Sequence, residues 1–257
     1  MKRTDYIYGT QDEIFQYYQL ESVLQEDIAK VYDEIDYVMK APDLLGKTVR
    51  VTQSQFSDVY RIMQEICEMT GIDEIPVYVY EDFYYGAESY GTERSWIEIS
   101  SKTIQDFSNT ELEFVLAREI YKVMDGVTRQ KTIFEENMKM LSRIAPEKIE
   151  SGKKNKFNKW YRVTNYSADN YGYLICRDIE ASVYAILKMV LNSSVLAQQI
   201  NILEFVQQAS EIDRMDSVVA NYTKSDEAVP YAPHRIHNIL SYAVSERALK
   251  IICGGDD

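Results

Sequence analysis

Apolar side chains recur every three or four residues over much of the chain, the spacing that gives a helix one buried face. The clearest such segment covers residues 111–126. It begins at a Ser-x-x-Glu pattern, in which Ser108 and Glu111 can each accept a hydrogen bond from a backbone N–H of the other. The same spacing predicts further helices over 54–70, 129–144, 165–176, 178–191, 196–210 and 233–252. Residues 213–229 lack this spacing and are predicted to be a loop.

A small sheet is predicted just before the clearest helix. Residues 77–80 form a run of valine and tyrosine that is typical of a strand. A second extended stretch lies between Gly86 and Gly91, and a third covers residues 96–99. Residues 47–51 form either a short strand or an extended entry. The sequence therefore predicts an α+β fold that is mostly helical, with a three- to four-stranded sheet beside the helix.

The domain organisation is predicted to be simple. Residues 1–45 combine acidic residues with aliphatic and tyrosine positions at helical spacing, so we expect an N-terminal helical arm. Residues 46–257 contain no repeat and no low-complexity linker. We therefore expect this part to form one domain, and the whole chain to be compact.

The composition restricts the possible functions. The 257 residues include 46% hydrophobic and 27% charged side chains, which is typical of a soluble globular protein. The formal net charge of −13 disfavours binding to nucleic acid or anionic lipid. We find neither a signal peptide nor an apolar run of about 18 residues, so no membrane span is predicted. The three cysteines lack metal-type spacing and indicate free thiols in a reducing cytoplasm.

One segment of the clearest helix can be compared with the His-Glu-x-x-His motif of zinc peptidases. In that motif the two histidines bind the metal, and the glutamate acts as general base. Here the segment reads Arg118-Glu119-Ile120-Tyr121-Lys122, so cationic side chains replace both histidines. A guanidinium has no lone pair to offer a metal, and a lysine can ligate only when it is neutral. By itself, the segment is also typical of an ordinary helix surface with a Glu–Lys pair.

The surrounding stretches resemble the soluble domain of the HtpX-like and CAAX-prenyl-protease-like gluzincin metallopeptidases, from Thr48 to Ala243. They follow the family's order: a helix and first strand, an edge strand, the strand before the zinc helix, the zinc helix, and a Glu-x-x-Ala-Asp segment with the helix after it. In this sequence these stretches are 51–56, 75–79, 90–93, 96–101, 112–119, 165–169 and 178–181. Pro230 with Arg235 resembles the family's C-terminal proline–arginine element. The resemblance implies a gluzincin fold.

The resemblance also implies a role for each matching position. Arg118 and Lys122 stand at the two histidine ligands, and Asn165 stands at the third ligand, a glutamate in the family. Glu119 stands at the general base. Asp169 stands at the aspartate that orients a ligand histidine.

Two further positions match residues of the family's C-terminal element. Arg235 stands at the arginine on the oxyanion side, and Val229 takes the place of a histidine that often precedes the proline. All three ligands are replaced while the framework is kept, so the resemblance implies no zinc, no other cofactor and no peptidase activity. The two cationic replacements and the two retained carboxylates balance in charge. We therefore predict an ion-pair cluster in place of the metal.

Three other features carry weaker signals. If the family's edge strand is kept, Tyr85, Tyr90 and Gly91 are expected to line a groove that holds an extended peptide. The basic segment 151–162 is either a solvated loop or a docking site for an acidic partner. His234 and His237 lack a third ligand, so surface or helix-packing roles are expected for them.

Three functions remain open from the sequence. The first, which the resemblance favours, is an inactive pseudo-peptidase that binds a peptide or partner protein, alone or within a larger assembly. The second is a working hydrolase that uses Glu119 with a metal held in another way, for instance by Glu119 and Asp169. The third is a purely structural helical protein whose groove is closed. The sequence names no partner, pathway or oligomeric state.

Overall fold

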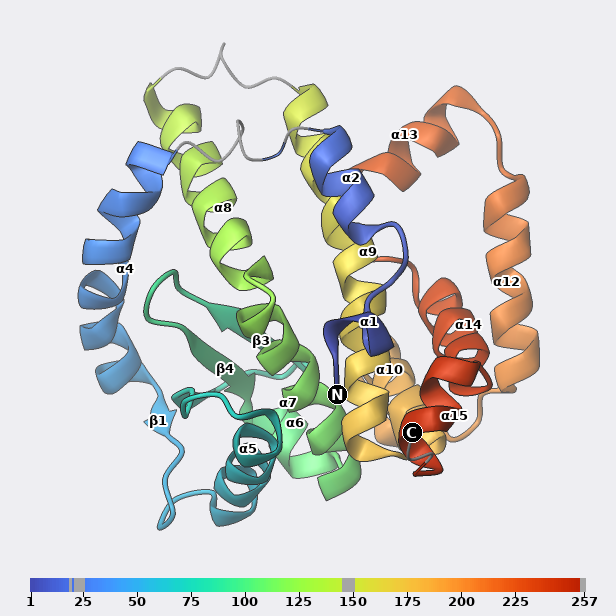
Figure 1. Cartoon of the computed structure of the whole chain (residues 1–257), viewed down its shortest axis with the longest axis horizontal. Helices are drawn as coiled ribbons and strands as arrows, with labels where there is room; N and C mark the ends of the chain where they lie inside the picture. The colour runs from blue at the N-terminus through green and yellow to red at the C-terminus, as the bar shows by residue number, and fades with distance from the viewer. Residues whose placement is uncertain (19, 21–25, 145–150, 255–257) are drawn as a thin grey trace.

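The computed structural model describes residues 1–257 except 19, 21–25, 145–150 and 255–257. Its one small sheet lies toward one side of the molecule, and helices make up the rest (Figure 1). The helices are α1 (Arg3–Tyr6), α2 (Gln11–Tyr17), α4 (Glu26–Lys47), α5 (Ser57–Thr70), α6 (Ser101–Asp106), α7 (Asn109–Met124), α8 (Val127–Ile144), α9 (Ser151–Cys176), α10 (Ile179–Leu191), α11 (Ser194–Ala197), α12 (Ile202–Arg214), α13 (Val218–Asp226), α14 (Ala232–Ala243) and α15 (Glu246–Ile252). The strands are β1 (Val49–Arg50), β2 (Val77–Tyr80), β3 (Ala87–Tyr90) and β4 (Trp96–Ser100). The structure confirms a mostly helical α+β chain.

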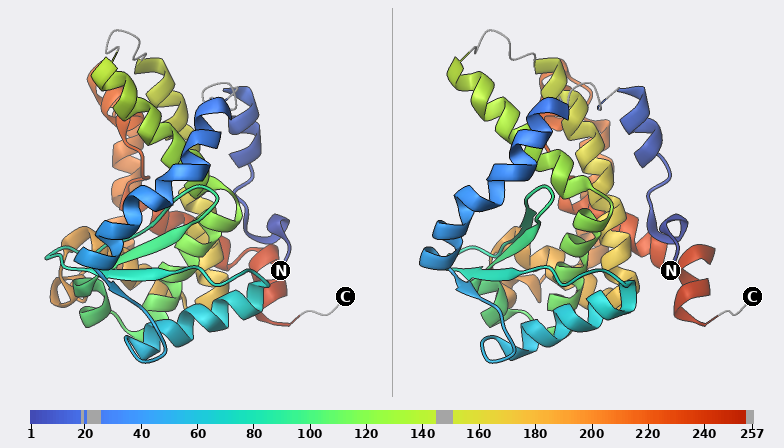
Figure 2. Two further views of the ribbon diagram at one scale, coloured as in Figure 1. Left: turned by 90° about the vertical axis from the view of Figure 1, so that its left-hand side faces the viewer. Right: turned by 60° about the vertical axis from the view of Figure 1, so that its left-hand side comes forward.

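The sheet is four-stranded and mixed, with the strand order β1-β2-β4-β3. β2 and β4 are parallel, whereas β1 and β3 are the antiparallel edge strands. One face joins the main core, where strand residues such as Val77 and Ile97 pack with apolar residues of α5 and α7. The other face carries Tyr78 and Trp96, which pack with Leu44 of α4. Figure 2 shows α4 and α5 on these opposite sides of the sheet.

The main core lies where α7 packs along α9, with α5 and α10 against α7. The N-terminal residues contribute to this core, because Tyr6 places its ring 5.6 Å from that of Tyr121 and 4.8 Å from that of Tyr171. Leu20 is also fully buried. The predicted arm over 1–45 thus packs in two places, with α1 and α2 on α9 and α4 on the sheet and α8.

The basic segment 151–162 is not a loop, as one interpretation of the sequence had it. It forms the first turns of the 26-residue helix α9. Phe157, Trp160 and Tyr161 recur at helical spacing and are buried, and Phe157 stacks on Phe134 of α8 with ring centroids 3.9 Å apart. Lysines stand before these aromatic residues and, at Lys159, between them, and they hide the apolar periodicity in the sequence.

Other boundaries also differ from the predictions. Residues 213–229 include the helix α13, which begins where the Ser217 side chain accepts a hydrogen bond from the backbone of Ala220. Residues 233–252 divide into α14 and α15, because Ser245 caps a new helix. Residues 196–210 divide in the same way at Asn201, which caps α12. Among the described helices, none is long and apolar enough to cross a membrane.

Candidate functional site

The helix α7 carries three buried charged side chains at the centre of the candidate site. It begins with the predicted reciprocal bonds between Ser108 and Glu111. The helix is buried over most of its length, including its charged Arg118, Glu119 and Lys122, whose side chains are 6%, 0% and 7% exposed. Because an isolated buried charge is unfavourable, each of them needs a partner close by.

Glu119 accepts hydrogen bonds from the strand β3 and from its own helix. One carboxylate oxygen, Oε2, accepts from the backbone N–H and from the hydroxyl of Ser89 in β3, both at 2.9 Å. The other, Oε1, accepts from Lys122 Nζ at 2.8 Å. Both oxygens of this fully buried carboxylate therefore have partners.

The helix α9 brings two polar residues to Arg118. Its Nε donates to Asp169 Oδ1 at 2.6 Å, and its Nη2 donates to Asn165 Oδ1 at 3.2 Å. The helices can approach closely here because Gly172 lacks a side chain. A Cβ at that position would lie 2.9 Å from the carbonyl oxygen of Phe114 and 3.0 Å from Arg118 Cγ.

Arg235 of α14 completes the arrangement. Its Nε and Nη2 donate to the two oxygens of Asp169 at 2.9 and 2.8 Å, a two-point contact that fixes both side chains. Burial alone would raise the pKa of Asp169, but Arg235 and Arg118 outweigh it and hold that pKa below its usual value. The Asp169 carboxyl is therefore held as an anion.

The structure thus brings together six residues that the sequence singled out. We call five of them the charge cluster: Arg118, Glu119, Lys122, Asp169 and Arg235. The sixth, Asn165, lies beside the cluster. These residues come from three helices, so the predicted ion pairs form between parts of the chain that are distant in sequence.

Other residues of the site were missed by sequence reasoning. Ser89 looked like an ordinary strand residue, yet it donates twice to Glu119 and its hydroxyl lies 2.7 Å from that of Thr128. Tyr161 places its ring 5.8 Å from Lys122 Nζ. Burial disfavours the Lys122 ammonium, and together with Arg118 it lowers the pKa of Lys122 despite the attraction of Glu119. No sequence signal marks Ser89 or Tyr161 for these contacts.

A cleft of about 280 Å³ lies over the charge cluster, and we call it the motif cleft. Among the residues that the structure describes, the cleft is lined by Tyr80, Gly86, Ala87, Glu88, Tyr90, Glu98, Arg118, Glu119, Lys122, Tyr161, Asn165, Met189, Val229 and Arg235. These residues come from the sheet, from α7, α9, α10 and α14, and from the segment before α14. The described part of the 1–45 arm does not contribute to this lining.

The three predicted groove residues lie in different places. Tyr90 lines the motif cleft, and its hydroxyl donates to Glu88 at 2.7 Å. Tyr85 instead donates to Asp106 at 2.6 Å and packs on Phe107, outside the described lining. Gly91 forms a turn with φ of 99°, where a side chain would meet the backbone oxygen of Arg94. Of the three, only Tyr90 therefore borders the cleft.

The outer edge of β3 is partly occupied by the protein itself. The N–H of Ser89 points to Glu119, and the N–H of Gly91 donates to Thr132 Oγ1 at 3.2 Å. Both bonds would have to break before a peptide could pair along the whole strand. The edge can therefore offer only part of its length to a peptide.

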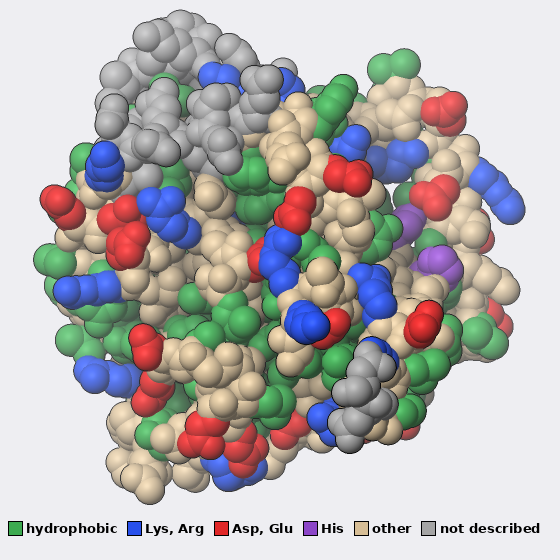
Figure 3. Space-filling view, viewed as in Figure 1, with side chains coloured by type: hydrophobic (Ala, Val, Ile, Leu, Met, Phe, Trp, Pro, Cys, Tyr) green, Lys and Arg blue, Asp and Glu red, His purple; other side chains and the backbone are tan. Residues whose placement is uncertain are grey.

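The residues at the motif do not fit a zinc ion. Arg118 has no lone pair, Lys122 is an ion-pair donor to Glu119, and the Asn165 oxygen accepts from Arg118. Across the described residues, no three or more His, Cys, Asp or Glu side chains are grouped so that they could hold a metal ion. His234 lies 3.0 Å from Asp213 of α12, and Figure 3 shows the histidines at the margin near α12 and α14.

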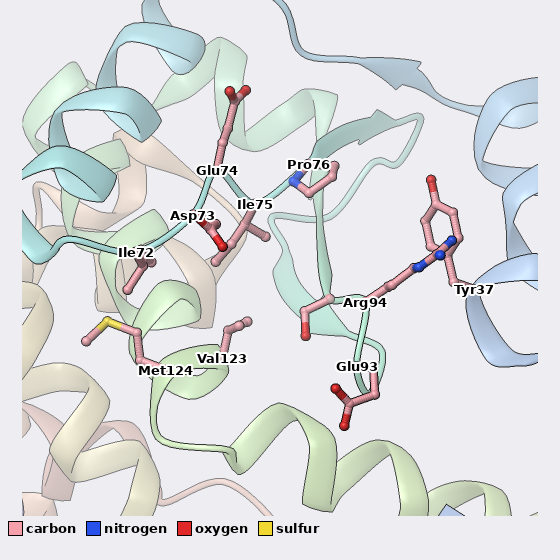
Figure 4. A pocket seen from close by; sticks show the side chains of 11 residues that line it. Tyr37, Ile72, Asp73, Glu74, Ile75, Pro76, Glu93, Arg94, Val123 and Met124 are labelled. Atoms are coloured by element: carbon pink, nitrogen blue, oxygen red, sulfur yellow. The ribbon is translucent and has the colours of Figure 1, made fainter. Parts of the chain in front are cut away.

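A second cleft, of about 470 Å³, lies at the C-terminal end of α7 beside Val123 and Met124. Figure 4 shows acidic side chains from two loops around it, and the Arg94 guanidinium lies 5.8 Å from the ring centre of Tyr37. Its described lining shares no residue with the motif cleft.

One of the comparisons with known proteins found a distant relative. The chain is distantly similar to a protein named as a metallopeptidase. That protein is Plastoglobule-localized metallopeptidase 48, chloroplastic, from Arabidopsis thaliana, which is 23% identical over 181 residues. The match covers 67% of this chain and 52% of the relative, so the chain spans about half the length of the relative it matches. No family model and no solved structure matches the chain.

Proposed function

We propose that this protein is a metallopeptidase-like pseudo-peptidase that binds a peptide segment of a partner protein in the motif cleft. One observation carries the proposal. The pairs Arg118–Asp169 and Lys122–Glu119 lie where the resemblance to HtpX-like gluzincins puts the metal and its ligands. The metallopeptidase-like relationship supports the fold from which such a site would have degenerated.

The geometry disfavours hydrolysis by Glu119. A general base must reach the water whose proton it takes. Glu119 is fully buried, and both of its oxygens already accept hydrogen bonds from Ser89 or Lys122. We therefore propose that this carboxylate now holds β3 and α7 together.

The motif cleft distinguishes the binding proposal from a purely structural role. A closed groove would leave no room above the charge cluster, whereas the cleft has a volume of about 280 Å³ and an aromatic border. We further propose a cytoplasmic location, because the three cysteines are unpaired. The name of the relative assigns that protein to the plastoglobules of chloroplasts.

Restoring the ligands tests the correspondence of residues. In the triple variant Arg118→His, Lys122→His and Asn165→Glu, we expect zinc to bind at about one ion per chain with a tetrahedral ligand set. The matched control is Arg61→His with Glu65→His, which places two histidines four residues apart on the exposed face of α5. Zinc affinity is measured by titration calorimetry after circular dichroism has shown that both variants are folded. If the triple variant binds zinc no more tightly than the control, the assignment of ligand positions is wrong.

A further inference from the structure

The charge cluster carries one unbalanced positive charge. Its cations are Arg118, Lys122 and Arg235, and its anions are Glu119 and Asp169, so the formal sum is 3 − 2 = +1. All five side chains are at most 8% exposed. An excess charge that is so nearly excluded from water is unfavourable unless an anion lies close to it.

The carboxylates on the cleft wall do not fully supply this anion. Glu88 attracts Lys122 of the cluster, but it is also paired with Lys131 at 2.7 Å, and Glu98 accepts from the indole N–H of Trp96 at 2.9 Å. Both side chains line the sheet side of the motif cleft, whereas the excess cation lies on its floor. The cleft therefore has a positive floor and a negative wall.

Hydrogen-bond donors remain on the floor. Arg118 uses Nε and Nη2 for Asp169 and Asn165, while its Nη1 lies 3.9 Å from Glu119, too far for a hydrogen bond. Lys122 has three N–H bonds, and its bond to Glu119 uses one. Arg235 donates from Nε and Nη2 to Asp169, so its Nη1 is still able to donate to a ligand.

We infer that the floor of the motif cleft binds a carboxylate carried by a peptide, an inference that rests on the proposed function and specifies its ligand. Arginine and lysine donors on a nearly buried floor suit a carboxylate in geometry and charge. One carboxylate balances the formal charge of the cluster. A phosphate carries about two negative charges at neutral pH, which exceeds the single positive charge of the cluster.

The wall supplies the reason to expect a peptide. Gly86, just before β3, accepts a hydrogen bond from the backbone N–H of Ser100 in β4. Because inward and outward groups alternate along an antiparallel strand, the backbone N–H and C=O of the next residue, Ala87, point to the outer edge. Ala87 lines the motif cleft. It lies between Gly86, which is bonded to Ser100, and Ser89, whose backbone N–H donates to Glu119. A peptide can pair at this one residue while Tyr80 and Tyr90 pack against its side chains.

Peptide pools test the inference and identify the source of the carboxylate. Four pools of randomised octapeptides without Asp or Glu are passed over the immobilised full-length protein. The first has free C-termini, the second is amidated, the third is amidated with one added Glu, and the fourth is amidated with one added Gln. Retained peptides are quantified by mass spectrometry.

We expect the first or third pool to be retained about tenfold more than its amidated or Gln counterpart. Retention of the first alone assigns a C-terminal carboxylate, and retention of the third alone assigns an acidic side chain. Equal retention of all four pools would overturn the carboxylate inference and leave peptide binding standing. Retention of none would overturn the inference and the proposed binding function together.

An isosteric variant separates a specific floor from general charge effects. Asn165→Asp adds a negative charge beside Arg118, which makes the floor neutral, and it gives up the bond that Asn165 Nδ2 donates to the Tyr161 carbonyl at 2.8 Å. The matched control is Asn201→Asp, the same change at the cap of α12, where aspartate also caps well. We expect Asn165→Asp to lower retention about tenfold and the control to leave it unchanged.

Lys122→Met provides a second variant that removes a donor directly, with Lys139→Met of the exposed Lys139–Glu136 pair as its control. If folded Asn165→Asp or folded Lys122→Met retains the peptides as well as the unmodified protein, the inference is wrong. Folding of each variant is checked by near-ultraviolet circular dichroism.

Discussion

Replacing Glu119 by alanine should destabilise the protein severely, although the proposed function requires no catalysis from it. The substitution removes a fully buried carboxylate that accepts three hydrogen bonds. It leaves the Lys122 ammonium without its partner at 2.8 Å, and Lys122 already has a pKa lowered by burial and by Arg118. It also leaves the Ser89 backbone N–H unpaired.

The magnitude follows from these contacts. Breaking a buried ion pair from one side costs about 3–5 kcal/mol. An unsatisfied buried N–H adds about 1–3 kcal/mol, although the two effects overlap because they share one carboxylate. We therefore expect Glu119→Ala to lower the free energy of unfolding by about 3–5 kcal/mol. A chain of this size loses roughly 2–4 °C in Tm per kcal/mol, so the shift is on the order of 10 °C.

The matched control is Glu136→Ala. Glu136 pairs with Lys139 at the same i,i+3 spacing and at 3.1 Å, but these side chains are 28% and 52% exposed. A pair in water contributes about 0–1 kcal/mol, so this variant should unfold almost like the unmodified protein. Urea denaturation followed by circular dichroism measures both variants.

A double-mutant cycle isolates the interaction of Glu119 with Lys122. The double variant Glu119→Ala with Lys122→Met removes both charges, so it should recover at least about 1 kcal/mol relative to the sum of the single losses. The reasoning is refuted if Glu119→Ala loses no more stability than Glu136→Ala, or if the cycle shows no coupling.

Three further outcomes are expected. Asp169→Asn should lower stability at neutral pH. The folded pKa of Asp169 is lowered, so its carboxylate stabilises the unmodified protein above the unfolded pKa near 3.9, and this stabilisation is lost as pH falls through the folded pKa. The gap in denaturation midpoint between the two proteins should therefore close below about pH 4, and a constant gap would contradict it. Gly172→Ala should destabilise by about 1–3 kcal/mol in urea titrations, because its Cβ would press on the carbonyl of Phe114; an unchanged midpoint would show that the helices are not so close. A thiol reagent should modify exposed Cys253 well before the buried cysteines, and rapid reaction of all three would mean that the core opens easily.

Local patterns were enough to predict much of the fold. The Ser108–Glu111 box sets the start of α7, and Gly71 ends α5 in the left-handed conformation that glycine favours. Strands β2 and β4 follow from runs of β-branched and aromatic residues. In contrast, the start of α9 was missed because lysines precede and interrupt its buried aromatic residues. The pattern of apolar residues was therefore informative except where charged side chains interrupt it.

The candidate site could be predicted only as a set of positions. The resemblance selected Arg118, Asn165, Asp169 and Arg235, and the structure places them in contact. It gave no sign of the bond from Ser89 to Glu119, because that contact depends on how β3 crosses α7. Contacts between distant elements depend on packing angles and register, which the spacing of residues along the chain does not encode.

The central claim is that fixed cations occupy the place where a metal would be held. The most direct measurement is the zinc content of the protein after purification without a chelator, determined by mass spectrometry of the elements. The account predicts far less than one zinc ion per chain, and no rise in Tm when zinc is added. One zinc ion per chain that is lost in the Asp169→Asn variant would contradict it.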